Sequence, residues 1–394
     1  MMTFTLANRT LNIKPSATLA VAARAAQLKA AGQDIINLGI GEPDFDTPEH
    51  IKEAAIKAIH DNFTRYTPVD GTPNLKKAIQ QKFERDNQLN YALNQIMVNS
   101  GCKQGIYNLM QTLLNPGDEV IIPAPYWVSY PEMTLLAEAI PVIIPTTFEQ
   151  RYKITAAQLQ QAITPKTKLF ILNSPSNPSG LAYSRDELIA LANVLLAHPH
   201  IFIASDDIYE KTLWDENAFY NILMVCPELI DRVIIHNGVS KTYAMTGWRI
   251  GYTAGPKELI TTMINIQSQS TSNPNSIAQY AAEAAIAGDQ NCVRQMIKAF
   301  QHRHDILVAA LNKIPGLQFH PADGTFYSFI NVQQIINTKN MTDDIAFAEY
   351  LLNQSGIALV PGTAFGIPGC IRLSFAISDA QLIKALDKLQ LALS

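Results

Sequence analysis

The sequence predicts an α/β fold in which a large domain, built on a mostly parallel sheet covered by helices, is joined to a smaller α+β domain. Short apolar runs without polar alternation recur between about residues 96 and 254, and helical patterns separate several of them. Strands of this kind are buried on both faces, as in parallel sheets. After about residue 290 the pattern changes to shorter units, and 394 residues are enough for two domains.

The first elements alternate along the chain. The apolar run 96–98 predicts a buried strand, and a helical pattern over 103–114 follows it. Pro116-Gly117 predicts a turn, after which 119–122 is expected to be a second buried strand. Further elements are predicted as strands at 168–172, 201–204, 232–236 and 249–254, and as a helix at 184–197.

A long helical stretch over 277–312, broken near Gly288, precedes the change of pattern. We therefore expect a large domain over 46–290. Residues 1–45 and 291–394 are expected to form an N-terminal arm and the small domain.

The composition excludes several classes of protein. Thirty Lys and Arg against 34 Asp and Glu give a net charge of −4, which argues against a general nucleic-acid binder. The four cysteines form no CxxC pair, so we predict no metal site and a reduced, cytoplasmic chain. The first 14 residues lack the pattern of a signal peptide, and no run reaches the roughly 18 apolar residues of a membrane span.

Unusual polar residues come directly after the predicted strands. Open α/β sheets bind ligands outside the carboxyl ends of their strands, so these residues are expected to share one site. The clusters are Ser100-Gly101-Cys102-Lys103, Tyr126-Trp127, Asn177-Pro178, Asp206 to Tyr209 and Ser240-Lys241.

Lys241 is the most distinctive of these residues. It lies at a predicted strand end among Met, Tyr and Trp residues. Partial burial lowers the pKa of a lysine and favours an amine that can form a Schiff base, although most lysines are simply surface residues. Arg249, eight residues later, has the forked guanidinium that suits a phosphate, or an ordinary salt bridge.

Asp206, Trp127 and the segment 100–103 each allow two interpretations. Asp206 fits a helix cap or a carboxylate aimed at a cationic ring nitrogen, and Trp127 fits a core residue or a surface stacked on a heteroaromatic ring. The segment 100–103 opens a helix whose free amides suit a phosphate, but such loops are common. It does not match GxxxxGK[ST], and Gly39-Ile40-Gly41 does not begin a GxGxxG motif.

Several longer motifs occur in the order found in a known family. The chain resembles the class I, fold-type I pyridoxal-phosphate aminotransferases over nearly its whole length. Within them it is similar to the bacterial-type aspartate aminotransferases, whose close relatives include the prephenate aminotransferases. The motifs are Lys14 to Thr18, Gly41 to Phe45, Pro125 to Pro131, Ser174 to Gly180, Asp206 to Glu210, Ile371 to Ser374 and, most specific, Gly238 to Gly251.

The resemblance implies roles around a pyridoxal 5'-phosphate cofactor. Lys241 resembles the lysine that holds the cofactor as an internal aldimine and then acts as acid and base in the 1,3-proton shift. Asp206 matches the aspartate that keeps the pyridine nitrogen protonated, which preserves the ring as an electron sink. Tyr209 and Asn177 match the groups that hydrogen-bond the phenolic oxygen, and Trp127 matches the stacked aromatic residue.

The resemblance also implies a phosphate cradle shared across a homodimer. The cradle positions are matched by Gly101, Cys102, Ser240 and Arg249, and Tyr66 matches a tyrosine that reaches the phosphate of the partner subunit. Cys102 departs from the Gly or Ala expected there, and Gly238 stands where some relatives have Ser.

The substrate residues follow from the same resemblance. Arg372 resembles the arginine that pairs with the substrate α-carboxylate, assisted by Asn177 and the backbone of Gly41 and bordered by Trp127. Lys103 resembles the lysine used for a distal carboxylate, helped by Ser16 and Thr18. The implied reaction moves the amino group of L-aspartate to 2-oxoglutarate, giving oxaloacetate and L-glutamate.

Other functions remain open at this point. Lys14, Thr18 and Lys103 also fit the pattern of prephenate aminotransferases, which make arogenate, and β-elimination is a further pyridoxal-phosphate chemistry on this fold. A regulator without turnover would carry an added DNA-binding domain, for which the roughly 45 residues before the large domain are too few. A nicotinamide dehydrogenase is disfavoured because GxGxxG is missing.

Overall fold

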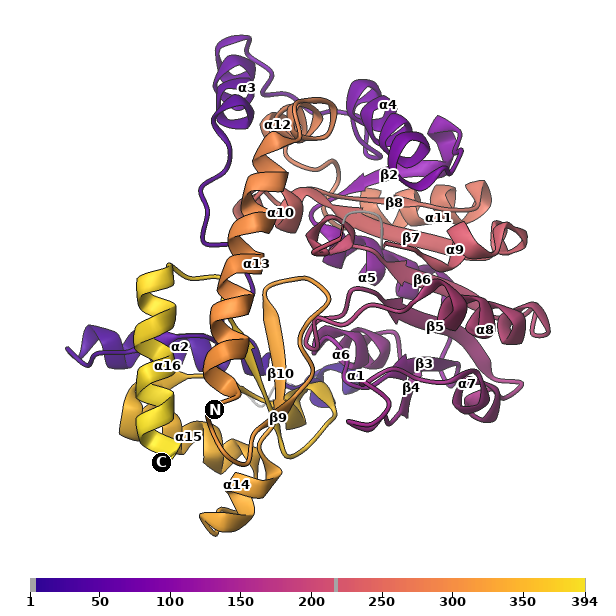
Figure 1. Cartoon of the computed structure of the whole chain (residues 1–394). Coiled ribbons are helices and arrows are strands. Elements are labelled where there is room, and N and C mark those ends of the chain that lie inside the picture. The colour runs from indigo at the N-terminus through magenta and orange to yellow at the C-terminus, as the bar shows by residue number, and fades with distance from the viewer. Residues whose placement is uncertain (1–4, 216–218, 394) are drawn as a thin grey trace.

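The computed structural model describes residues 5–215 and 219–393. Its centre is a seven-stranded sheet with the order β2-β8-β7-β6-β5-β3-β4 (Figure 1). The strands are β2 (Ile96–Asn99), β3 (Glu119–Pro123), β4 (Ile140–Ile144), β5 (Thr167–Asn173), β6 (Phe202–Asp206), β7 (Val233–Gly238) and β8 (Gly251–Ala254). Strand β8 is antiparallel to both neighbours and every other pair is parallel, which confirms the predicted mostly parallel sheet.

Alternate residues of β2, β3, β5, β6 and β7 pack into two different hydrophobic cores. Ile122 and Ile234 pack on one face of the sheet, whereas their neighbours Ile121 and Ile235 pack on the other. The first core is shared with helices α5 (Cys102–Leu113), α6 (Ser129–Leu136) and α11 (Lys257–Ser268). The second is shared with helices α4 (Pro73–Lys82), α8 (Arg185–Leu196) and α12 (Ser276–Ala287). Because helices cover both faces, the strands show no polar alternation in the sequence.

Strand β4 was not predicted from the sequence. It lies at the edge of the sheet, and Ile140 and Ile143 are 47% and 36% exposed. Pro141 within the run argues against a central strand, but an edge strand tolerates a proline. All the strands that were predicted and the helices predicted at 103–114 and 184–197 are present, and none of their ends differs from the prediction by more than two residues.

The predicted helical stretch 277–312 is two helices. After α12 the chain turns at Gly288 and continues as α13 (Asn291–Leu311), which runs from the large sheet toward a second sheet (Figure 1). The second sheet has the order β12-β13-β10-β9 and is antiparallel. Its strands are β9 (Gln318–Phe319), β10 (Tyr327–Asn331), β12 (Val360–Pro361) and β13 (Cys370–Ser374).

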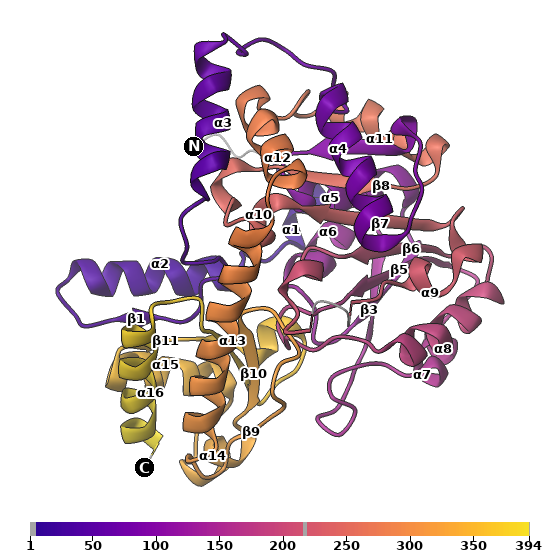
Figure 2. The ribbon, with the colours of Figure 1, turned by 45° about the horizontal axis from the view of Figure 1, so that its top comes forward.

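The N-terminal segment joins the C-terminal part of the chain. Strand β1 (Ile36–Asn37) pairs in parallel with β11 (Ile357–Ala358), and α2 (Ala17–Ala30) lies beside this pair (Figure 2). The same part contains α14 (Gln333–Thr338), α15 (Asp344–Ser355), η6 (Gly362–Phe365) and α16 (Asp379–Leu393). This pairing brings residues 16–41 close to the elements that follow α13.

The remaining helices are short or lie at the periphery. They are α1 (Asn8–Leu11), α3 (Glu49–His60), η1 (Phe83–Asn87), η2 (Leu93–Gln95), α7 (Ala156–Ala162), η3 (Glu210–Thr212), α9 (Ile222–Val225), η4 (Pro227–Leu229), α10 (Val239–Thr242) and η5 (Thr246–Trp248). Over residues 5–215 and 219–393, no helix combines the length and apolar character needed to cross a membrane.

Candidate active site

A cavity of about 460 Å³ lies at the carboxyl ends of β5, β6 and β7. Its wall contains most of the residues that the sequence predicted for a site, namely Thr18, Gly41, Cys102, Lys103, Trp127, Asn177, Asp206, Tyr209, Ser240, Lys241, Arg249 and Arg372. Ser16, Gly101 and Tyr66 are outside this wall. The parallel strands therefore bring together side chains that lie up to about 350 residues apart.

Lys241 lies in α10, directly after β7. Its Nζ donates a hydrogen bond to the carbonyl oxygen of Gly41 at 2.6 Å. Burial lowers the pKa of Lys241 to about 8 against an opposing effect of Glu42, and the positive charges of Arg249 and Arg372 lower it further. Near neutral pH a much larger fraction of this amine is therefore uncharged than in an ordinary lysine, and the uncharged form is the one that reacts with an aldehyde.

Asp206 ends strand β6 and is only 4% exposed. The hydroxyl of Tyr130 donates to its Oδ2 at 2.5 Å, and the backbone N–H of Ile208 donates to its Oδ1 at 3.3 Å. Burial raises the pKa of Asp206, and these donors oppose that effect. Tyr130, in α6, was missed by the sequence analysis although it lies within the quoted motif that contains Trp127.

Arg372 is a cation buried in the second sheet, 2% exposed on β13. Its Nη1 donates to Asn177 Oδ1 at 3.0 Å and its Nη2 to the carbonyl oxygen of Gly39 at 2.6 Å. Within the described residues its Nε has no hydrogen-bond partner. Its polar contacts are thus to neutral groups, which suits the guanidinium to bind a carboxylate from outside the chain.

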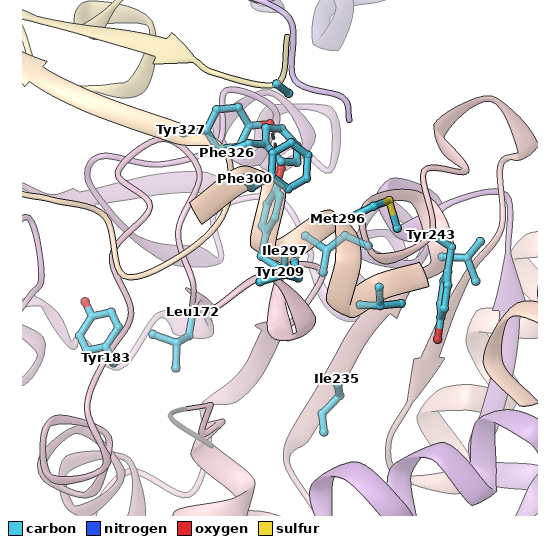
Figure 3. Close-up of a cluster of buried hydrophobic side chains, with 14 of the residues drawn as sticks. Leu172, Tyr183, Tyr209, Ile235, Tyr243, Met296, Ile297, Phe300, Phe326 and Tyr327 are labelled. Atoms are coloured by element: carbon cyan, nitrogen blue, oxygen red, sulfur yellow. Dashed lines mark hydrogen bonds between the residues drawn. The ribbon is translucent and has the colours of Figure 1, made fainter. Parts of the chain in front are cut away.

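The hydroxyls of two tyrosines contact each other near Arg372. The hydroxyls of Tyr209 and Tyr327 are 3.0 Å apart, and Phe326 and Phe300 pack beside them (Figure 3). A Cβ atom added to Gly41 would lie only 2.7 Å from the Tyr327 hydroxyl. Tyr327 was not predicted, because it comes from β10 and no local motif marks it.

Lys103 supplies a further cation on the wall of the cavity, and Trp127 lies beside it. Lys103 Nζ lies 4.7 Å from the centroid of the Trp127 ring. Burial lowers the pKa of Lys103, and Arg249 lowers it further. Ser16 lies two residues before Thr18, which lines the cavity. At the start of α2, Ser16 Oγ lies 2.9 Å from Thr18 Oγ1.

Another part of the wall combines the start of α5 with Arg249. Gly101 precedes α5 with a φ of 82°, and a Cβ there would lie 2.2 Å from Arg249 Nη2. Arg249 Nη1 donates to the Thr246 carbonyl at 2.9 Å. Free helix amides beside a guanidinium are a favourable environment for a phosphate. The positive φ favours glycine at position 101, and a side chain there would also displace the guanidinium of Arg249.

Tyr66 stands apart from the other predicted site residues. It is 92% exposed and does not line the cavity. Among the residues described, no group of three or more His, Cys, Asp or Glu side chains is arranged to hold a metal ion.

Comparison with known proteins identifies the family. The model of the aminotransferase class I and II family matches residues 33–389. The aspartate/prephenate aminotransferase of Nitrosomonas europaea is 54% identical over 99% of this chain and 100% of its own length. The aspartate/prephenate aminotransferase of Cereibacter sphaeroides is 50% identical over 98% of each chain.

Solved structures agree with this assignment. The aspartate aminotransferase from Rhizobium meliloti has a TM-score of 0.95 and 46% identity, with 99% of each chain covered. The aspartate aminotransferase from Thermus thermophilus with maleate has a TM-score of 0.93 and 40% identity, covering 99% of this chain and 100% of that one. The chain belongs to the class I and II aminotransferases, and the fold is the fold-type I architecture expected from the sequence.

Enzymes of this family depend on pyridoxal phosphate, and the cavity fits that cofactor. It offers a lysine with a lowered pKa, a buried carboxylate on Asp206, and the corner formed by α5 and Arg249. These groups match the aldehyde, the ring nitrogen and the phosphate of the cofactor, respectively.

Proposed function

We propose that this aminotransferase moves the amino group of L-aspartate to 2-oxoglutarate, giving oxaloacetate and L-glutamate. The observation that carries the proposal is a pair of cations, Arg372 and Lys103, on the wall of the cavity that also contains Lys241. A substrate with two carboxylates can pair with both cations. The Thermus thermophilus relative, which was solved with the dicarboxylate maleate, supports this choice.

The proposed roles of the chain's own residues follow from their contacts. Pyridoxal phosphate, when bound, supplies an aldehyde for the amine and a ring that delocalises electrons from the substrate Cα–H bond. Arg372, held by Asn177 and Gly39, pairs with the α-carboxylate and fixes which bond at Cα is broken. Lys241 Nζ removes the proton from the substrate Cα and later returns a proton.

The proposed cofactor contacts follow from the resemblance to the family, and the position of most of these residues on the cavity wall supports them. When the cofactor binds, Asp206 would keep a proton on the ring nitrogen, Tyr209 and Asn177 would hydrogen-bond the ring oxygen, and Trp127 would cover the ring. Gly101, Cys102, Ser240 and Arg249 would hold the phosphate. Gly41 through its backbone, and Ser16 and Thr18 together with Lys103, help to place the substrate.

Prephenate is the second candidate for the amino acceptor. The two relatives compared above carry both substrates in their names, and they cover nearly the whole chain. Prephenate also has two carboxylates, so it too can pair with Arg372 and Lys103. We propose that the enzyme accepts both oxo acids.

The test is a spectrum followed by an assay. Purified protein should show a visible band from the lysine-bound cofactor that bleaches with L-aspartate and returns with 2-oxoglutarate. Adding prephenate to the bleached form tests the second acceptor. A band that survives aspartate would refute aspartate as the donor, and release of pyruvate and ammonia from a cysteine conjugate would indicate a β-lyase.

We propose further that the enzyme is a cytoplasmic homodimer whose sites need both subunits. The support is that Tyr66 is almost fully exposed and that Leu19, which lines the cavity, is 71% exposed in the single chain. Mixing inactive Lys241→Ala with weakened Tyr66→Ala subunits should restore activity, because a hybrid contains one intact site. Activity that never exceeds the sum of the separate variants would refute shared sites.

The proposed domain division follows the two sheets. We assign residues 46–290 to the large domain, which contains the seven-stranded sheet, and residues 1–45 and 291–394 to the arm and the small domain.

A further inference from the structure

Cys102 contacts the carboxylate of Asp206, and both residues line the cavity. Cys102 is the first residue of α5, and its Sγ lies 3.6 Å from Asp206 Oδ1. Of the four free cysteines, only Cys102 lies among the residues that line this cavity. No role was predicted for its side chain, since the resemblance placed it only among the phosphate contacts.

The thiol acts as a donor in this contact. Burial raises the pKa of Cys102 well above its usual range, and the negative charge of Asp206 raises it further. The sulfur therefore keeps its proton at neutral pH. An ionised carboxylate can only accept hydrogen bonds, so the S–H points at Oδ1.

The hydrogen bond from Cys102 decides which oxygen of Asp206 can still accept a further hydrogen bond. Oδ1 accepts from the N–H of Ile208 and from the thiol of Cys102, which uses both of its lone pairs. Oδ2 accepts from the Tyr130 hydroxyl, which uses one. Within this set of contacts, one lone pair of Oδ2 is left for a further donor.

We propose that Cys102 is a positioning residue that saturates Oδ1 of Asp206, so that Oδ2 receives the protonated ring nitrogen of the cofactor. The inference rests on the role of Asp206 proposed above. The S–H dipole also spreads the negative charge of the carboxylate. Cys102 thereby reduces the negative potential that the rest of the site experiences.

The test compares Cys102→Ala, which removes the donor, with Cys102→Ser, which keeps one. The readout is the visible absorption band of the lysine-bound cofactor in the holoenzyme, measured as a function of pH. Its midpoint is the pH at which half of the lysine-bound cofactor is protonated. Loss of the donor should raise this midpoint by a few tenths of a pH unit, because greater negative potential favours the protonated form. The serine variant should stay at or below the wild-type midpoint.

The outcomes are distinguishable. Equal midpoints in all three proteins, or an equal shift in both variants, would overturn the proposal, because a packing effect does not separate Ala from Ser. A wild-type protein without any visible band would instead refute the proposed function, and this inference with it.

Infrared spectroscopy of the wild-type holoenzyme provides a second test that does not need a well-folded serine variant. The S–H stretch lost in Cys102→Ala should lie at lower frequency than that of a free thiol in an apolar solvent. A stretch at the free-thiol frequency would show that no hydrogen bond is made and would overturn the proposal.

Discussion

The guanidinium of Arg372 lies over the ring of Tyr327, with its central carbon 4.6 Å from the ring centroid. The same ring carries the hydroxyl that contacts Tyr209. Tyr327 therefore supports the proposed carboxylate-binding residue through its face and the proposed cofactor-binding residue through its hydroxyl. These two contributions can be separated by mutation.

Replacing Tyr327 by Phe keeps the ring and removes only the hydroxyl. We expect the KM for aspartate to stay within about threefold of wild type, since the cation–π contact remains. Tyr327→Leu removes the ring as well and should raise KM by about tenfold, from the loss of about 1–1.5 kcal/mol. Steady-state kinetics check this, and equal KM values in the two variants would contradict it.

Arg372→Ala should lower kcat/KM by about 10²- to 10³-fold for every amino acid substrate. The expected loss is about 3–4 kcal/mol, because a buried, charge-assisted pair with the α-carboxylate is removed. Arg372→Lys should recover little of this, since a lysine lacks the forked geometry. Arg185→Ala, an exposed arginine on α8, serves as control. An unchanged kcat/KM in Arg372→Ala would contradict the assignment.

Lys103→Met should change substrate preference more than overall activity. The kcat/KM for aspartate should fall by about 10- to 100-fold, because the distal carboxylate loses its cation. The kcat/KM for alanine should change by less than about threefold. Lys313→Met, at an exposed lysine, is the matched control. An equal loss for both substrates would show that Lys103 does not read the distal carboxylate.

Lys241→Met should stabilise the cofactor-free protein at neutral pH. The folded-state pKa of Lys241, about 8, is below the ordinary value of 10.5. Burial of the Lys241 charge therefore lowers the free energy of unfolding. This destabilisation is fully present below pH 8 and disappears as the pH rises toward 10.5. We expect a gain of about 1–2 kcal/mol at pH 7, after allowing for partial exposure.

Urea unfolding of both cofactor-free proteins at pH 7 and pH 10 measures this difference. The gain from Lys241→Met should be smaller at pH 10. The exposed-lysine variant Lys313→Met should show no gain at either pH. A gain that does not depend on pH would mean that better packing, and not the buried charge, explains it.

The large sheet and part of the site could be predicted from sequence because their signals are local. Lys241, Asp206 and Asn177 follow buried strands within a few residues, so the sheet topology alone brings them to one edge. Arg372 carries no such signal and was assigned only through resemblance to a family. Its contacts with Asn177 and Gly39 join segments 195 and 333 residues away.

The residues that sequence reasoning missed depend on long-range packing. Tyr130 faces inward from α6, and its position on Asp206 depends on how that helix packs against the sheet. Tyr327 reaches Tyr209 across 118 residues of chain. Strand β4 was missed because its proline is tolerated only at an edge, and edge position is not visible in the sequence.

The close approach of Gly41 to the hydroxyl of Tyr327 also constrains how this family can diverge. A methyl group at position 41 and a hydroxyl at the tip of residue 327 compete for the same space. The two positions should therefore covary among homologues with this backbone. A lineage that acquires alanine at position 41 is expected to have lost the tyrosine at position 327 first, because the opposite order passes through a sterically blocked intermediate.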